Sequence, residues 1–257
     1  MVTFAPNICT MGVSLLIDIG NTAIKYCLAR EGKTGEVKNL RGATLDEWRY
    51  NLELILDEYI PDSVVLCSVR PGYGEIARHF LSSDQLYIVG PELKLPYQLD
   101  YETPGTLGAD RIALVAGAAG YLPGNNLLVI DAGTCITLDL LVNGVYPGGA
   151  IFPGILMRAR AMNTFTAGLP FIEPMKKVEP IGKSTADSIR SGTVNGVRLE
   201  IEGWIKMFKK KFPKLKVIIT GGDLVYFDNL LKNNIFAVPD LLFRGLLEIL
   251  TINEKNK

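Results

Sequence analysis

Apolar positions along the first third of the chain switch between two periods, which predict strands and helices in turn. Four short runs rich in β-formers have the length of strands: 13–19, 24–29, 63–67 and 85–89. Residues 45–59 instead place apolar side chains every three or four positions, directly after the capping-box sequence Thr44-Leu45-Asp46-Glu47. A second helix is predicted over 74–81. This order of elements predicts a mixed sheet with helices packed on it.

The rest of the chain repeats this theme after an irregular loop at 91–108, which is rich in Pro, Gly and Tyr. Helices are predicted at 110–121, along one long segment that carries Ile189 and Phe208 on a single face, at about 223–231, and from 240 onward. The predicted strands are 127–130, 136–142, 145–152, 217–220 and 235–238. We therefore predict an α/β fold of two halves, 1–122 and 123–257.

Two acidic, glycine-bearing turns support this duplication. Asp18-Ile19-Gly20-Asn21-Thr22 and Asp131-Ala132-Gly133-Thr134 each follow an apolar run. Glycine lets the backbone approach an anion closely, and Thr and Asn side chains donate hydrogen bonds to phosphate oxygens. An Asp beside phosphate is reasonable when a cation stands between them. Either copy alone would be interpreted as a simple tight turn, but the pair favours two phosphate-binding loops.

Further segments contain residues that could bind phosphate or the substrate, or accept a proton. Lys25 can neutralise phosphate charge, although a solvated strand lysine is the simpler alternative. In the segment 105–111, Asp110 can accept a proton from a hydroxyl and Arg111 can grip a carboxylate with two parallel bonds. The alternative for this pair is an N-cap Asp and a surface Arg. Paired glycines at 148–149 and 221–222 are expected to end strands and open helices, which suits an anion or a purine face.

The composition of the chain argues against several other classes of protein. Lys plus Arg equals Asp plus Glu at 27 each, which gives no reason to propose nucleic acid as a partner. Four widely spaced cysteines without a Cys-x-x-Cys pair favour a reducing compartment over a disulfide scaffold or zinc site. No apolar run is long enough for a membrane span. His79 has no obvious nucleophile nearby, so a Ser-His-Asp mechanism is not expected, and residues 182–185 lack the first glycine and the strand of a P-loop.

The ordered set of motifs resembles the bacterial type III pantothenate kinase family. These motifs are Asp-Ile-Gly-Asn-Thr-x-x-Lys, Leu-Gly-Ala-Asp-Arg, Asp-Ala-Gly-Thr, Gly-Gly-Ala-Ile-x-Pro-Gly and Thr-Gly-Gly-Asp, and they span about Leu16 to Asp223. That family belongs to the superfamily of acetate and sugar kinases, Hsp70 and actin. The resemblance implies duplicated actin-like (ribonuclease H-like) domains with a nucleotide cleft between the halves. It also implies a cytoplasmic enzyme that phosphorylates pantothenate with ATP, the first committed step towards coenzyme A.

The resemblance also implies roles for individual residues. Asp110 would be the catalytic base. Asp131 would bind a monovalent cation, K⁺ or NH₄⁺, and Asp18 would hold Mg²⁺ with ATP. The implied ATP contacts are Asp18, Ile19, Gly20, Asn21, Thr22, Ala23, Ile24, Lys25 and Thr134. The implied pantothenate contacts are Tyr101, Gly108, Ala109, Asp110, Arg111 and Thr185. Similar proteins are homodimers in which the partner chain completes the pantothenate pocket.

Two alternatives stay open at this point. One is another small-molecule kinase of the superfamily, such as a sugar kinase, although the loop before Asp110 offers few side chains for binding many hydroxyls. The other is a nucleotide-switched binding protein that shares the fold without catalysis. The ten residues before Met11 also leave open whether translation starts at Met1 or Met11.

Overall fold

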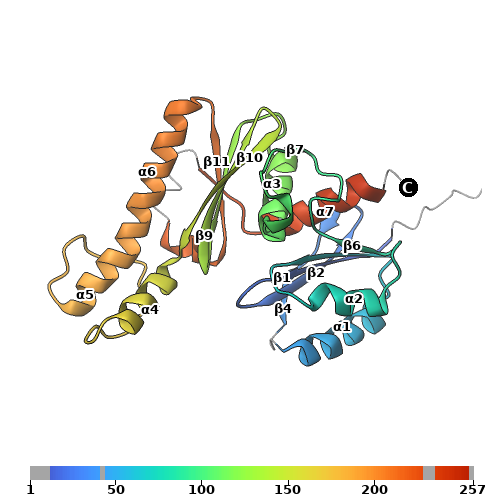
Figure 1. The fold of residues 1–257 in the computed structure, drawn as a ribbon, viewed down its shortest axis with the longest axis horizontal. Coiled ribbons are helices and arrows are strands. Elements are labelled where there is room, and N and C mark those ends of the chain that lie inside the picture. The colour runs from blue at the N-terminus through green and yellow to red at the C-terminus, as the bar shows by residue number, and fades with distance from the viewer. Residues whose placement is uncertain (1–11, 41–43, 228–234, 255–257) are drawn as a thin grey trace, which may run out of the picture. The chain divides into compact units, whose positions relative to one another are not determined.

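The computed structural model describes residues 12–40, 44–227 and 235–254, and the chain divides into two compact units after Val89 (Figure 1). The sequence places this division at 122/123 instead. The two differ because the segment 90–122 packs with the C-terminal helix and so belongs to the second unit.

The first unit is built on a mixed sheet in the order β3-β2-β1-β5-β6, with β4 also paired to β2. Strand β1 runs antiparallel to β2 and parallel to β5. The strands are β1 (Ser14–Ile19), β2 (Ile24–Arg30), β3 (Lys33–Thr34), β4 (Lys38–Leu40), β5 (Ser63–Ser68) and β6 (Leu86–Ile88). The sequence predicts this mixed sheet correctly but misses β3 and β4, which are short polar edge strands without an apolar alternation.

Helices α1 (Leu45–Tyr59) and α2 (Tyr73–Phe80) pack on this sheet (Figure 1). The predicted capping box is confirmed: the Glu47 N–H donates to Thr44 Oγ1 at 3.2 Å, and the Thr44 N–H donates to Glu47 Oε2 at 3.1 Å. Trp48 and Leu52 are fully buried on the apolar face of α1. Amphipathic spacing and a satisfied N-terminus therefore account for this helix.

The second unit has a sheet in the order β12-β11-β8-β9-β10-β7. Its strands are β7 (Gln98–Leu99), β8 (Leu127–Ala132), β9 (Cys135–Val142), β10 (Val145–Pro153), β11 (Lys216–Thr220) and β12 (Ile235–Ala237). Strand β8 runs antiparallel to β9 and parallel to β11. The set β9-β8-β11 thus repeats the arrangement β2-β1-β5, as the duplicated motifs predict.

The helices of the second unit are α3 (Ala109–Tyr121), α4 (Ile155–Phe165), α5 (Thr185–Arg190), α6 (Gly196–Lys211) and α7 (Leu241–Glu254). The predicted long helix is real but interrupted, because a π-helical turn at Ser191–Asn195 separates α5 from α6. The helix predicted at 223–231 is wrong where the chain is described. There Gly222–Tyr226 forms a 3₁₀ turn, and 228–231 lie outside the described residues.

Helices α3 and α7 cross with their backbones in contact. A Cβ atom on Gly245 would lie 1.8 Å from the Ala113 carbonyl oxygen, and one on Gly117 would lie 2.3 Å from the Leu241 carbonyl oxygen. Asn253 also accepts a hydrogen bond from the Lys94 N–H and donates one to the Lys94 carbonyl. The C-terminal helix therefore holds α3 and the start of the loop that leads to it. Among the described helices, none has the length and apolar character needed to cross a bilayer.

Candidate functional site

The first predicted phosphate loop is the turn between β1 and β2. The strand register pairs Asp18 with Lys25, and the Gly20 N–H closes the turn by donating to the Ala23 carbonyl at 3.0 Å. Ile19 and Ile24 are buried in the core below it, whereas Asn21 and Thr22 are exposed at the tip. The turn therefore presents two polar side chains on a rigid base, with a carboxylate and an ammonium group at its two flanks.

The second predicted loop is the turn between β8 and β9. Asp131 pairs with Thr137, the Gly133 N–H donates to the Cys135 carbonyl at 3.1 Å, and Thr134 is exposed. Gly154, the residue before α4, donates its N–H to the Thr134 carbonyl at 3.0 Å. A Cβ atom on Gly154 would lie 2.0 Å from the Gly133 carbonyl oxygen. Glycine is needed there because any side chain would push this turn away.

Gly221 brings a third predicted segment to the same end of the sheet. It comes directly after β11, the parallel neighbour of β8, and its φ of +100° is one that glycine readily adopts. A Cβ atom there would lie 2.2 Å from the Ala132 carbonyl oxygen and 2.5 Å from Asp131 Oδ1. The bare backbone thus leaves a carboxylate oxygen and a carbonyl oxygen beside each other.

The Asp131 carboxylate and the Ala132 carbonyl oxygen could serve as ligands for a cation. Oxygen ligands suit hard cations, whereas a dedicated divalent site generally uses several carboxylates. Among the described residues, no cluster of three or more His, Cys, Asp or Glu side chains could hold a metal ion. Mg²⁺ bound with a nucleotide would take most of its ligands from phosphate oxygens and water.

The paired glycines at 148–149 do not form the predicted turn. They lie inside β10, which continues to Pro153 before α4 begins at Ile155. A Cβ atom on Gly149 would lie 1.6 Å from the Leu138 carbonyl oxygen, and one on Gly148, at φ +120°, would lie 3.3 Å from the Tyr101 ring. The prediction is wrong because these glycines serve close packing within the sheet and against Tyr101.

Asp110 lies in the first turn of α3, after Gly108 at the N-cap and Ala109. It is not an N-cap residue, which removes the simpler alternative. Its Oδ1 accepts a hydrogen bond from the Arg111 N–H at 2.8 Å. Burial raises the pKa of the Asp110 carboxyl, although the Arg111 N–H and the Arg111 charge oppose the change. The structure thus offers a desolvated carboxylate at a helix N-terminus, as a proton-accepting group requires.

Arg111 is buried rather than on the surface. Its Nε and Nη2 lie 2.8 Å and 2.7 Å from Asp139 Oδ1, and the Tyr146 hydroxyl donates to the same oxygen at 2.7 Å. The rings of Tyr97 and Tyr101 lie 6.0 Å and 6.1 Å from the Tyr146 ring. This cluster links Arg111 and Tyr101, both predicted to contact the substrate, through Asp139 and Tyr146.

Asp139 and Tyr146 are not among the site residues predicted from the sequence. A signal for Asp139 was present, because it is a lone carboxylate within the apolar run Ile136-Thr137-Leu138-Asp139-Leu140-Leu141. A charge on a fully buried strand requires a charged or hydrogen-bonding partner. Its partner Arg111 could not be identified from sequence alone, since the two residues come from different elements.

Thr185 lies apart from this cluster. It is exposed at the start of α5, where Ser184 caps the helix by accepting the Asp187 N–H at 3.1 Å. Figure 1 shows α5 well separated, within the second unit, from α3, the helix that carries Asp110 and Arg111. The Gly-Lys-Ser-Thr sequence is a capped helix start, consistent with the rejection of a P-loop.

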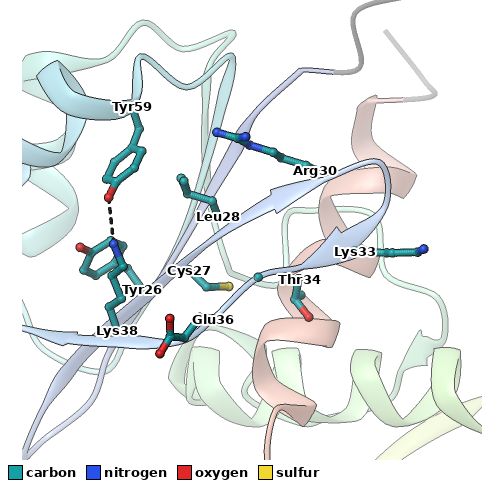
Figure 2. Close-up of a pocket in the computed structure, with 10 residues that line it drawn as sticks. Tyr26, Cys27, Leu28, Arg30, Lys33, Thr34, Glu36, Lys38 and Tyr59 are labelled. Carbon is teal, nitrogen blue, oxygen red and sulfur yellow. Dashed lines mark hydrogen bonds between the residues drawn. The ribbon is translucent and has the colours of Figure 1, made fainter.

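A hollow of about 370 Å³ lies on the first unit beside β2, β3 and β4 (Figure 2). The Lys38 ammonium group donates to the Tyr59 hydroxyl at 2.9 Å and lies 5.9 Å from the centre of the Tyr26 ring. Its charge is therefore engaged within the protein. The hollow includes none of the residues predicted for the site.

Asp223, in the 3₁₀ turn after Gly221, has a titration that can be tested. Burial raises its pKa from 3.8 to about 6. The folded protein then binds this proton more tightly than the unfolded chain does. The free energy of unfolding should therefore fall as the pH rises from about 4 to about 6, and stay at the lower level above that.

We expect Asp223→Asn to remove this fall, because the amide is neutral throughout. The variant should gain on the order of 1 kcal/mol over the wild type at pH 7, after allowance for solvent access to this half-buried group, and little at pH 4. Urea unfolding from pH 4 to 8 measures the difference. Parallel stability curves for the two proteins would contradict the prediction.

Comparisons with known proteins show which family this chain resembles. The family model for type III pantothenate kinase matches residues 14–207. The type III pantothenate kinase of Christiangramia forsetii is 40% identical over 243 residues, covering 94% of this chain and 99% of that protein.

Two solved structures confirm the predicted fold class. A Campylobacter jejuni protein assigned to the Baf family of transcriptional activators has a TM-score of 0.63 at 22% identity, covering 94% of this chain and 99% of that one. MreB5 of Spiroplasma citri, bound to ADP, has a TM-score of 0.52 at 12% identity, covering 95% and 96%. At these identities the similarity concerns the fold alone.

Proposed function

Because the chain belongs to the type III pantothenate kinase family, we propose that its two Asp-x-Gly turns and Asp110 carry out phosphoryl transfer from ATP to pantothenate. The family phosphorylates pantothenate in coenzyme A biosynthesis. Such a transfer depends mainly on positioning the reactants and neutralising phosphate charge, with little covalent work by the protein. The observation that carries the proposal is the desolvated Asp110 carboxylate beside a buried, fixed Arg111.

The first turn, Asp18 to Lys25, binds ATP phosphates in this proposal. Backbone N–H groups around Gly20 and the exposed side chains of Asn21 and Thr22 supply hydrogen-bond donors. Lys25 supplies positive charge, and Asp18, its partner across the strands, would hold the Mg²⁺ that accompanies ATP and offsets phosphate charge. Ile19, Ala23 and Ile24 contribute backbone and support to the same turn.

The second turn contributes Thr134 to ATP and Asp131 to a monovalent cation. The Asp131 carboxylate would hold K⁺ or NH₄⁺, and the Ala132 carbonyl oxygen, which lies close to it beside Gly221, would be a further oxygen ligand. When bound, this cation supplies positive charge that offsets the negative charge of the phosphate chain.

Asp110 orients the primary hydroxyl of pantothenate and accepts its proton as the oxygen attacks phosphorus. Burial favours this role because a raised pKa brings the carboxylate closer to the working pH. Arg111 binds the acceptor's carboxylate, and Tyr101, Gly108 and Ala109 form further contacts. Thr185 lies apart from these residues within one chain, so it would contact the acceptor only in a pocket to which two subunits contribute. We also propose a cytoplasmic homodimer in which the partner chain completes the pocket.

The experiment that tests the acceptor is a coupled ATP assay. We expect ADP release to depend on pantothenate, and a panel of sugars to give no comparable turnover. The product should be pantothenate phosphorylated at its primary alcohol, identified by mass spectrometry and ³¹P NMR. Turnover of a sugar instead of pantothenate would assign the chain a different acceptor.

The same assay tests the cation. We expect activity in potassium or ammonium buffer and a large loss in sodium buffer of equal ionic strength, because Na⁺ is smaller and more tightly hydrated. Asp131→Asn should raise the potassium concentration for half-maximal rate by about tenfold or more, while the KM for pantothenate stays close to that of the wild type. Full activity in sodium-only buffer would contradict the cation site.

A further inference from the structure

We propose that Asp139 is a positioning residue that sets the preference of the enzyme for an acidic acceptor, by fixing Arg111 from behind. This inference rests on the proposed function, in which Arg111 binds the acceptor's carboxylate. Asp139 itself is fully buried and contacts Arg111 rather than any substrate.

Both contacts of the guanidinium with Asp139 are made by one side of the group. Nε donates to Asp139 Oδ1 at 2.8 Å, and Nη2, which is buried and has no hydrogen bond to the described residues, lies 2.7 Å from the same oxygen. A guanidinium presents donors in a rigid planar fork, so holding one side also fixes the direction of the other. Asp139 therefore decides where the remaining donors of Arg111 point.

The ion pair between Arg111 and Asp139 is not explained by a gain in the stability of the fold. A buried ion pair typically gives little or no net stabilisation over apolar residues of similar size, because both charges lose their hydration. Here the pair joins the first turn of α3 to the middle of β9. Such a costly arrangement fits a need for a fixed charge beside Asp110, the neighbour of Arg111 in sequence.

Tyr146 extends this support to a second substrate contact. Its hydroxyl donates to the same Asp139 oxygen that Arg111 contacts. Its ring lies beside that of Tyr101, which in turn packs against Gly148. Asp139 and Tyr146 together therefore position Arg111 and Tyr101, although neither belongs to the predicted substrate contacts.

The test compares two acceptors: pantothenate and its neutral analogue, in which a hydroxymethyl group replaces the carboxylate. We expect Asp139→Asn to lower kcat/KM for pantothenate by about tenfold to a hundredfold, the range for one charge-assisted interaction. The value for the neutral analogue and the KM for ATP should stay within about threefold of wild type. A general loss of folding would instead impair all three.

Two tyrosine variants form a matched pair that keeps the test decisive if Asp139→Asn does not fold. Tyr146→Phe removes the hydroxyl bound to Asp139. Tyr97→Phe removes a neighbouring buried hydroxyl that donates to the Ile112 carbonyl at 3.0 Å instead. We expect a reduced preference for the acidic acceptor in Tyr146→Phe only, with similar thermal stability in both variants.

Arg111→Gln distinguishes a failure of the positioning role of Asp139 from a failure of the proposed role of Arg111. If it lowers the acid preference while Asp139→Asn and Tyr146→Phe keep the wild-type ratio, the positioning role is wrong and the proposed function stands. If Arg111→Gln itself leaves the ratio unchanged, Arg111 does not bind the carboxylate, and its proposed role in substrate binding fails together with the positioning role of Asp139. Equal losses in Tyr97→Phe and Tyr146→Phe would also overturn the positioning role.

Discussion

Asp110→Asn is expected to lower turnover by about 10²–10⁴-fold while ATP and pantothenate bind nearly as in the wild type. The amide has almost the same shape as the carboxylate but cannot accept the hydroxyl proton. It also keeps an oxygen that can accept the Arg111 N–H, so the start of α3 should remain intact. Steady-state kinetics measures turnover, and calorimetric titration with each substrate measures binding.

Asp100→Asn is the matched control, because it makes the same chemical change at an exposed position in the preceding loop. It should keep wild-type turnover. The wild-type pH profile provides a second check. Since Asp110 must be ionised and burial raises its pKa, activity should fall with decreasing pH through a value above that of an ordinary aspartate. If Asp110→Asn keeps more than about a tenth of wild-type turnover, Asp110 is not the base.

Gly245→Ala is expected to destabilise the second unit by about 3 kcal/mol or more, at or beyond the upper end of the usual cost of overpacking. The added methyl group would lie 1.8 Å from the Ala113 carbonyl oxygen, and 3.0 Å from the Gly117 nitrogen. Because these are backbone atoms of α3, no side chain can move aside and the helices must separate. Urea unfolding monitored by circular dichroism measures the loss.

Gly203→Ala is its control within α6. A methyl group at that position meets no atom within 4 Å, so the helix propensity of alanine should dominate. We expect a gain of about 0.5–1 kcal/mol. A loss of stability in Gly245→Ala and a gain in Gly203→Ala would show that contact between α3 and α7, and not the removal of a glycine, determines the change in stability. A neutral effect of Gly245→Ala would mean that α3 and α7 do not cross this closely in solution.

Local patterns predicted most of the secondary structure. The α1 helix is an example, since its capping box and its apolar repeat are both encoded within one short segment, 44–59. Strands β3 and β4 were not predicted. They are held by backbone pairing to β2 at the edge of the sheet, which requires no particular pattern of side chains. The 3₁₀ turn at 222–226 was also not predicted, because a strand that ends in Gly-Gly can lead into either an α-helix or a 3₁₀ helix.

Some parts of the candidate site could be predicted from the sequence, and others could not. The Asp-x-Gly turns and the Asp110-Arg111 pair are short enough to be predicted from sequence, and the family resemblance gave them roles. The partnership of Arg111 with Asp139 joins residues 28 positions apart on different elements. The packing of Gly148 against Tyr101 likewise depends on a bulge in β10. Such pairings arise from tertiary structure, which no local pattern contains.

The crossing of α3 and α7 has a consequence for the order of folding. The helix that carries Asp110 takes its final position only against residues 241–254, which come much later in the chain. Contacts so distant in sequence close a long loop, and the entropy lost in closing it delays their formation. The first unit should therefore fold before this helix is fixed in place, and a chain cut before residue 241 should contain a folded first unit without a working enzyme.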